Sequence, residues 1–202
     1  MICGTYGEYQ WHLRYLMDVL GLEKGVSRAA ALSLLVLEDG PVFMCDTFVA
    51  EDPDYEDLAD ITVRAAAKVQ DFGIKPKVAV VMIGTNNSGS DDAPGIAQGV
   101  TKIVQTIHEK SPATKVLLLA VFPRGSKPDG AFNASHEKLK QVNATLAKLD
   151  DGKSTFYLDI GEKFLTNGAL KAEIMPDFLH LSKAGYQIWA DAITPKLAEL
   201  MK

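Results

Sequence analysis

Asp177 and His180 stand three residues apart near the C-terminal end of the chain, in the stretch Asp177-Phe178-Leu179-His180. A carboxylate at this distance on one loop can accept a hydrogen bond from the histidine ring and fix its tautomer, which is the orienting role of the carboxylate in catalytic triads. A histidine held in this way can act as a general base. The spacing also fits an ordinary loop, so it is only one element of a possible site.

Asn86 follows an apolar stretch that ends at Ile83, in the polar segment Gly84-Thr85-Asn86-Asn87. If the apolar stretch is a strand, this segment presents a side-chain amide at the edge of a sheet. Such an amide can donate a hydrogen bond to an oxyanion, because oxyanion holes need preorganised N–H donors aimed at developing negative charge. The alternative is a plain turn, in which asparagine tolerates left-handed backbone angles. Taken alone, the segment favours the plain turn.

Neither a metal nor a cofactor is predicted. His12, His108 and His136 each fall within a predicted helix, without cysteines or carboxylates at metal-ligand spacing, so we expect surface or helix-packing roles for them. Cys3 and Cys45 also lack that spacing. They are expected to be small buried hydrophobic residues rather than a disulfide or a catalytic thiol.

The composition is that of an acidic globular protein. The chain has 202 residues, of which 47% are hydrophobic and 23% charged, and its net charge is −5. One substantial core fits this length, so we predict a single domain over residues 1–202. The negative charge argues against nucleic-acid and anionic-membrane partners, which call for a concentrated basic surface. The longest apolar stretch is far shorter than a membrane span and no signal peptide is evident, so we expect a soluble, cytoplasmic protein.

Helices and strands alternate along most of the chain. Helices are predicted over residues 9–20, 53–73, 97–110, 135–149 and 183–201, and strands over residues 32–37, 42–49, 77–83, 115–121 and 155–160. The first two strands flank the turn sequence Glu38-Asp39-Gly40-Pro41 and are predicted to form a hairpin.

Residues 78–83 and 116–121 are continuous apolar runs rich in Val, Leu, Ile and Ala, as expected where helices cover both faces of a parallel sheet. We therefore predict an α/β fold with a three-layer, doubly wound, flavodoxin-like (Rossmann-like) parallel sheet and an antiparallel hairpin at its edge. Ligands of such sheets lie at the carboxyl ends of the strands. The informative segments then begin at Gly84, Pro123 and Gly161, together with residues 176–182.

Motifs from about Ile74 onward resemble the SGNH (GDSL-type) hydrolase family, in particular its platelet-activating-factor acetylhydrolase-like branch. They are Lys75-Pro76-Lys77-Val78, Gly84-Thr85-Asn86-Asn87, Phe122-Pro123-Arg124-Gly125 and Asp177-Phe178-Leu179-His180-Leu181. The resemblance implies that Asn86 is the oxyanion asparagine. It also implies that Asp177 and His180 are the pair that activates the nucleophile of a carboxylic-ester hydrolase.

The serine nucleophile implied by this resemblance is missing. The family carries Gly-Asp-Ser directly after its first strand, and this motif does not occur in the chain. The corresponding segment reads Ile2-Cys3-Gly4-Thr5-Tyr6-Gly7. There, Thr5 is a weak nucleophile candidate and the serine position falls near Tyr6, whose phenol cannot replace an activated serine. The second-block glycine, which helps to form the oxyanion hole, has no clear match after Val49 either.

The first portion resembles a different family, the phosphotransacetylase-like domain of phosphate acetyltransferases and of some malic enzymes. The residues that carry this resemblance are Met1-Ile2-Cys3-Gly4-Thr5, His12-Leu13-Arg14-Tyr15, Gly25-Val26-Ser27, Ala29-Ala30-Ala31-Leu32-Ser33 and Asp46-Thr47-Phe48-Val49. The similarity runs to about residue 79, so a join between fragments 1–79 and 80–202 is predicted within a helix–strand segment that fits both families.

Three functions follow from this pattern. The first is an engineered chimera of two α/β fragments without an intact active site and without evolved activity. The second is an SGNH-type ester hydrolase with residual activity, in which Thr5 or water attacks with the help of His180, Asp177 and Asn86. The third is a weak ligand-binding module. No defined partner is predicted, and a homodimer is compatible with the sequence.

Overall fold

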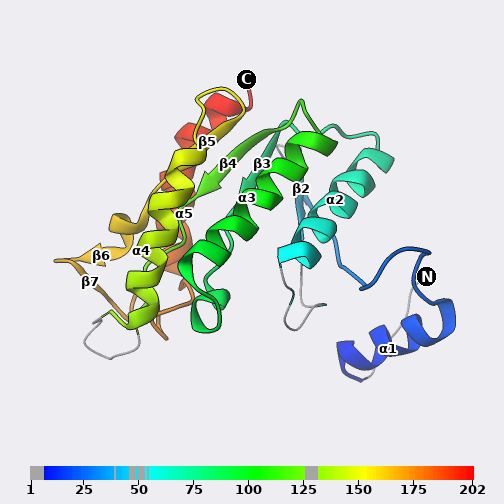
Figure 1. Cartoon of the computed structure of the whole chain (residues 1–202), viewed down its shortest axis with the longest axis horizontal. Coiled ribbons are helices and arrows are strands. Elements are labelled where there is room, and N and C mark those ends of the chain that lie inside the picture. The colour runs from blue at the N-terminus through cyan, green and yellow to red at the C-terminus, as the bar shows by residue number, and fades with distance from the viewer. Residues whose placement is uncertain (1–6, 39, 46–48, 50–52, 54, 126–131) are drawn as a thin grey trace. The chain divides into compact units, whose positions relative to one another are not determined.

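The computed structural model describes residues 7–38, 40–45, 49, 53, 55–125 and 132–202 (Figure 1). The chain groups into two compact units, Met1–Ile61 and Thr62–Lys202. The boundary between these units falls inside helix α2 (Tyr55–Asp71), which is followed by Gly73, a residue with a left-handed φ of 75°. The single domain with a join near residue 79 stays a prediction.

In its described residues, the first unit contains helix α1, a hairpin and the start of α2. Helix α1 (Tyr9–Leu20) has the predicted bounds and ends at Gly21, and none of its residues is buried. Strands β1 (Ser33–Leu37) and β2 (Gly40–Met44) pair antiparallel, with Ser33 opposite Met44 and Leu37 opposite Gly40. The predicted hairpin is therefore confirmed.

Within the described residues, β1 and β2 form a two-stranded sheet of their own. The predicted place of this hairpin at the edge of the parallel sheet is not confirmed and stays a prediction. Hairpin chemistry specifies only the local turn and register, and the strand beside which a hairpin docks depends on tertiary packing.

The second unit is built on three parallel strands in the order β3 (Val78–Val81), β4 (Lys115–Leu119) and β5 (Thr155–Leu158). Val78 pairs with Lys115, and Val116 pairs with Thr155. Helix α3 (Ala93–Lys110) connects β3 to β4, and α4 (Ala134–Leu146) followed by the 3₁₀ turn η2 (Ala147–Leu149) connects β4 to β5. This is the predicted α/β alternation. Within the described residues these three strands follow one another in sequential order, so the doubly wound, flavodoxin-like order that was predicted is not confirmed.

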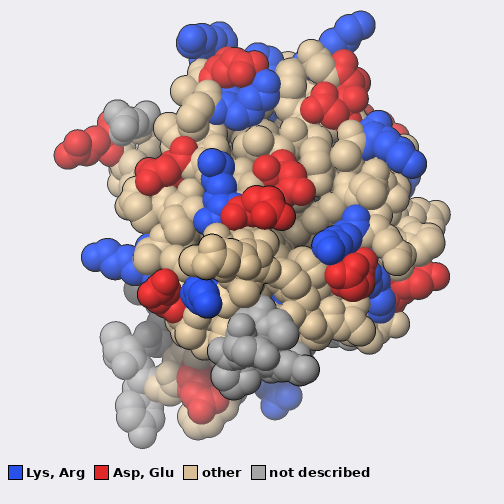
Figure 2. Space-filling view, turned by 90° about the vertical axis from the view of Figure 1, so that its left-hand side faces the viewer, with Lys and Arg blue, Asp and Glu red and all other residues tan. Residues whose placement is uncertain are grey.

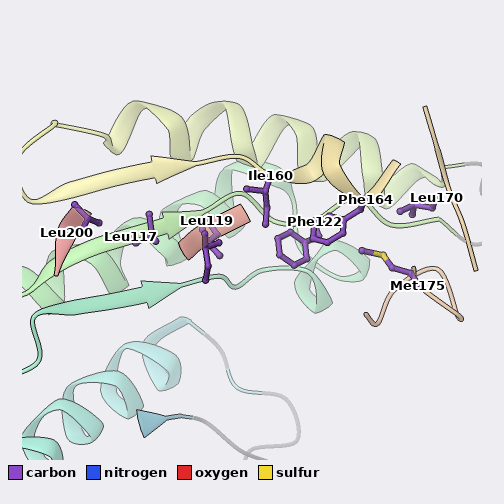
Figure 3. Close-up of a cluster of buried hydrophobic side chains, with 9 residues drawn as sticks. Leu117, Leu119, Phe122, Ile160, Phe164, Leu170, Met175 and Leu200 are labelled. Carbon is purple, nitrogen blue, oxygen red and sulfur yellow. The ribbon is translucent and has the colours of Figure 1, made fainter. Parts of the chain in front are cut away.

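Helices lie on both faces of this sheet. Figure 1 shows α3 and α4 on one side and α5 (Lys183–Leu200) on the other. Leu117 and Leu119 of β4 are fully buried in one cluster with Ile193 and Leu200 of α5 (Figure 3). Val116 and Leu118, which alternate with them along the strand, are also fully buried. Because successive side chains of a strand point to opposite faces, both faces of β4 are covered. This explains why the strand is apolar from Val116 to Leu119.

Side-chain caps define where the helices of the second unit begin. The Asp92 carboxylate accepts a hydrogen bond from the backbone N–H of Gly95, and the Ser182 hydroxyl accepts one from the backbone N–H of Gly185. Because Asp92 is the cap and Pro94 occupies the first turn, α3 begins at Ala93 rather than at the predicted residue 97.

A second, short hairpin was not predicted. Strands β6 (Leu165–Thr166) and β7 (Ala169–Leu170) pair antiparallel after the 3₁₀ turn η3 (Gly161–Phe164). The two residues between them, Asn167 and Gly168, have φ values of 53° and 75°. Both are left-handed, as in a two-residue hairpin turn that favours Asn-Gly.

Charges of both signs are intermingled on the surface. Figure 2 shows Lys and Arg side chains next to Asp and Glu side chains over the face that it displays. On this face the mixture gives no large area of one sign that would steer a highly charged partner. None of the helices in the described ranges is both long and apolar enough to cross a membrane.

Candidate active site

Asn86 lies in a one-turn 3₁₀ segment, η1 (Asn86–Gly89), that follows β3. The chain enters this turn through Gly84, whose φ is 112° and which is buried. A Cβ atom at this position would lie 2.8 Å from Cγ2 of Ile96. The junction therefore requires glycine for both its backbone angle and its close approach to α3. The side chain of Asn86 is exposed, as an oxyanion donor must be to reach a substrate.

The η1 turn is held by its own hydroxyl and by two cationic side chains. Ser88 is 2% exposed, and its Oγ donates to the carbonyl oxygen of Thr85 at 2.7 Å. Arg124 Nη1 donates to the same carbonyl at 2.8 Å and to Ser88 Oγ at 3.1 Å. Lys138 Nζ donates to the carbonyl oxygens of Ser88 at 2.8 Å and Asp91 at 2.6 Å.

Asp177 and His180 form the predicted pair. His180 Nδ1 lies 2.6 Å from Asp177 Oδ2, while Asp177 Oδ1 accepts from the backbone N–H groups of Leu179 at 3.0 Å and His180 at 2.7 Å. These hydrogen bonds, first of all the one from the His180 side chain, lower the pKa of Asp177 to about 2. The side chains of His180 and Asp177 are 78% and 55% exposed, so the imidazole is open to solvent.

Phe178, between the two, has a left-handed φ of 58°. This angle is costly for an aromatic residue and persists only where surrounding contacts hold it. The Phe178 carbonyl accepts a hydrogen bond from the backbone N–H of Gly125 at 3.0 Å, and the Phe178 N–H donates to Met175 O at 2.9 Å. The loop that carries the Asp177–His180 pair is thus fixed at its middle residue.

Arg124 and Gly125 connect the two halves of the site. Arg124 binds the Thr85 carbonyl at the start of the Asn86 turn, and its neighbour Gly125 binds the Phe178 carbonyl between Asp177 and His180. The structure therefore ties both segments to one short stretch after β4. Within the described ranges, no hydrogen bond joins Asn86 directly to the pair. The FPRG motif was noted in the sequence, but the tethering contacts of its arginine and glycine were not predicted.

The remaining predicted residues lie elsewhere or outside the described part of the chain. Thr5 and Cys3 belong to residues 1–6, which the structure does not describe. Cys45 is exposed, whereas the sequence predicted burial, because the strand before it belongs to the exposed hairpin rather than to a sheet core.

Among the histidines, His108 Nε2 lies 2.8 Å from Thr155 Oγ1, and the buried His136 ring stacks on Phe132 at 3.7 Å. These are helix-packing roles, as predicted. Within the described ranges of the chain, no three His, Cys, Asp or Glu side chains cluster so that they could hold a metal ion.

Comparison with known proteins identifies two relationships. A human platelet-activating factor acetylhydrolase IB subunit alpha1 is 35% identical over 130 residues, which is 63% of this chain and 54% of that subunit. An NADP-dependent malic enzyme of Haemophilus influenzae is 40% identical over 138 residues, which is 68% of this chain and 17% of that enzyme. The chain thus spans about half of the acetylhydrolase subunit and less than a fifth of the malic enzyme.

These alignments do not confirm a join near residue 79. The malic enzyme match is longer than the predicted fragment 1–79. Together the two alignments exceed the 202 residues of the chain, so they overlap well beyond the short segment that the two families were predicted to share. Malic enzymes are among the relatives, whereas the resemblance to a phosphotransacetylase is not supported. An engineered or chimeric origin is not supported by these comparisons.

The fold agrees with solved hydrolase structures. A GDSL-like lipase from Bacteroides thetaiotaomicron superimposes with a TM-score of 0.60 and 15% sequence identity, over 73% of this chain and 72% of that one. The model of the GDSL-like lipase/acylhydrolase family matches residues 48–188, beginning well before Ile74, where the motifs had suggested that the resemblance starts. The chain belongs to the GDSL-like lipase/acylhydrolase family.

Proposed function

We propose that the chain is a carboxylic-ester hydrolase of low turnover, in which the Asp177–His180 pair supplies the general base. The observation that carries this proposal is the 2.6 Å contact between His180 Nδ1 and Asp177 Oδ2, on a loop that leaves the ring 78% exposed. A histidine that is fixed by a carboxylate on one nitrogen and open to solvent on the other can accept a proton from an attacking hydroxyl group.

The bond to Asp177 assigns the tautomer. Since an ionised carboxylate can only accept, His180 Nδ1–H donates to it and the Nε2 lone pair is free. His180 Nε2 would take the proton of the attacking oxygen as that oxygen bonds to the ester carbon. The Asn86 amide would donate to the resulting oxyanion. On collapse, the C–O bond to the alcohol breaks and His180 returns the proton to the leaving oxygen.

The attacking group is water or the Thr5 hydroxyl, because the sequence has no Gly-Asp-Ser motif. When triad residues are removed from a serine hydrolase, the reaction is still about 10³–10⁴-fold faster than the uncatalysed reaction in water. This remainder comes largely from the oxyanion hole and substrate binding. Here the second-block glycine also has no counterpart. We therefore expect turnover at or below that range, with Thr5 disfavoured because its branched side chain restricts χ1.

The proposed substrates are esters with a short acyl group. The relative at 35% identity is named an acetylhydrolase, and the chain aligns with 54% of it. The family match over residues 48–188 covers Asn86, Asp177 and His180. Both support acyl-ester chemistry at these residues, while the alcohol portion of the substrate is left open by the proposal.

The test is hydrolysis of triacetin followed by alkali titration at constant pH. An alkyl ester is preferred to an activated aryl ester, because a free imidazole cleaves aryl acetates without any site. We expect slow hydrolysis that His180→Ala reduces by roughly a hundredfold, the lower end of what a general base contributes. His12→Ala, which removes an imidazole from α1, is the matched control and should leave the rate unchanged. Equal rates for the wild type and His180→Ala would refute the proposal.

A second candidate is a chain without catalytic activity. It is favoured by the absence of the Gly-Asp-Ser motif. The Thr5→Ala variant separates the readings of the nucleophile. If only His180→Ala lowers the rate, water attacks, and if both variants lower it, Thr5 is the nucleophile. If the wild type does not exceed the buffer rate, the second candidate stands.

A further inference from the structure

The turn that carries Asn86 receives hydrogen bonds from two cationic side chains of distant segments. Two of its carbonyl oxygens, those of Thr85 and Ser88, and that of Asp91 just beyond it receive hydrogen bonds from Arg124 and Lys138, at distances of 2.6–2.8 Å. Both donors are distant in sequence, by 36 to 50 residues. Hydrogen bonds from charged groups are stronger than neutral ones, so these contacts fix the backbone on both sides of Asn86.

Among the described residues, Arg124 donates its side-chain hydrogen bonds to this turn and not to a carboxylate. Within the described residues it makes no ion pair, and its Nε is buried without a hydrogen-bond partner. A half-buried guanidinium without a counter-charge is costly, and such a cost is retained only where the contacts made are useful. The contacts that Arg124 makes are the Thr85 carbonyl and the buried Ser88 hydroxyl.

Lys138 completes the attachment from the other side of the turn. It projects from the first part of α4, with its Nζ between the carbonyl oxygens of Ser88 and Asp91. Lys140, two residues further along the same helix, is exposed and forms an ion pair with Glu137 on that helix, at 3.1 Å. The two lysines therefore differ in role although they share a helix and a charge.

We propose that Arg124 and Lys138 are positioning residues, which hold the Asn86 turn so that the Asn86 amide keeps one orientation toward the ester oxygen. The inference rests on the proposed function for its catalytic consequence. Arg124 also adjoins Gly125, which binds the carbonyl of Phe178 between Asp177 and His180. Loss of the Arg124 contacts should therefore disturb the relative placement of the amide and the base, and small misplacements can cost up to about 10²-fold in rate.

The experiment compares Arg124→Met, Arg124→Lys and Lys138→Met with Lys140→Met as the matched control. Three readouts are taken on each full-length variant. The first is amide hydrogen exchange of Ser90 and Asp91, whose N–H groups donate to Asn87 O at 3.1 and 2.8 Å. The second is kcat and KM for triacetin. The NMR signals of the Asn86 side-chain amide, assigned with Asn86→Ala, report its orientation without any turnover.

We expect about tenfold faster exchange at Ser90 and Asp91 in Arg124→Met and Lys138→Met, since each loses charged hydrogen bonds. The kcat value should fall by roughly tenfold while KM stays constant, and Arg124→Lys should recover part of both effects. Lys140→Met should match the wild type. Arg124→Lys and Lys138→Met also cover the case in which Arg124→Met fails to fold.

Two results would overturn the inference. Unchanged exchange and unchanged Asn86 amide signals in the folded variants would show that the contacts do not fix the turn. Faster exchange with an unchanged kcat would show that the fixed turn has no catalytic role. If the wild type itself is inactive, the proposed function fails, and the exchange and Asn86 signals still decide whether the two cations hold the turn.

Discussion

The two units of the chain differ most in how far their apolar residues are buried. In the second unit, Val116, Leu117, Leu118 and Leu119 are all fully buried. In the first unit no residue of α1 is buried, and Leu34, Leu35, Val36 and Leu37 of β1 are each at least 42% exposed. Apolar strands occur in both units, so composition alone does not make a core. Helices on both faces of a parallel sheet do.

The difference teaches where stability and function reside. A two-stranded hairpin is marginal in water by itself, whereas a sheet covered on both faces is not. Asn86, Asp177 and His180 all follow strands or precede a helix of the second unit. The residues proposed for chemistry are therefore supported by the part of the chain that has a packed core.

The largest expected effect is on the free energy of unfolding. Leu117→Ala removes a fully buried side chain from β4, and such changes cost about 2–5 kcal/mol in cores. Leu35→Ala, at a side chain that is 45% exposed in β1, should cost less than about 1 kcal/mol. Urea denaturation of the two variants measures both values. Equal losses would mean that the hairpin is as well packed as the sheet.

The next largest expected effect is on the rate of ester hydrolysis, through the orientation of His180. Asp177→Asn keeps an oxygen that can accept from the N–H groups of Leu179 and His180, but it replaces the oxygen that accepts from His180 Nδ1. The loop should persist while the histidine tautomer is no longer fixed, and triacetin hydrolysis should fall by roughly tenfold. Unchanged backbone amide shifts for Leu179 and His180 would show that the loop is intact. A rate equal to the wild type would exclude Asp177 as the orienting group.

Local patterns predicted most of the elements correctly. Helix α1 has the predicted bounds because its apolar positions recur at helical spacing and Gly21 ends it. The start of α3 was predicted four residues late, since Asp92 and Pro94 were not recognised as a cap and first turn. The β6–β7 hairpin was missed although Asn167-Gly168 is a strong two-residue turn signal, because each strand is only two residues long.

The candidate site was predictable only where its contacts are local. The Asp177–His180 bond spans three residues, so spacing could indicate it. The bond from Arg124 to Thr85 spans 39 residues, and no periodicity in the sequence encodes such a contact. Contacts between distant segments were therefore the part of the site that the sequence could not predict.

A smaller expected effect on stability comes from the N-cap residues of one helix in each unit. The N-cap of α5 is Ser182, whose hydroxyl accepts from Gly185 N–H at 3.2 Å, whereas the N-cap of α1 is Glu8, whose side chain makes no such bond. Ser182→Ala should destabilise the second unit by about 1 kcal/mol. Glu8→Ser should supply a side-chain cap and stabilise α1 by about a few tenths of a kcal/mol. The helical content of α1 should rise accordingly. Circular dichroism and thermal unfolding of both variants measure the two effects. An unchanged free energy of unfolding in Ser182→Ala would show that the Ser182 cap does not stabilise the second unit.

The smallest effect is a pH dependence that belongs to the second unit. His136 is 7% exposed on α4, its Nδ1 has no hydrogen-bond partner, and its ring stacks on Phe132. Burial lowers the pKa of His136 below the ordinary value of 6.5, and the nearby Lys140 lowers it further against the opposing effect of Glu137 and Glu162. Because the folded-state pKa is the lower one, the unfolded chain binds the proton first as the pH falls.

The contribution of His136 to stability is therefore complete above about pH 6.5 and is lost as the pH falls from 6.5 toward and through the folded-state pKa. His136→Phe keeps the stacking on Phe132 but cannot take up a proton, so its free energy of unfolding should vary less with pH across this window. Urea denaturation at pH 7.5, 6.5 and 5.5 provides the measurement, with His12→Phe in the first unit as the control. A pH dependence in His136→Phe as steep as that of the wild type would show that the buried imidazole is not its source, and would direct attention to the carboxylates around α4.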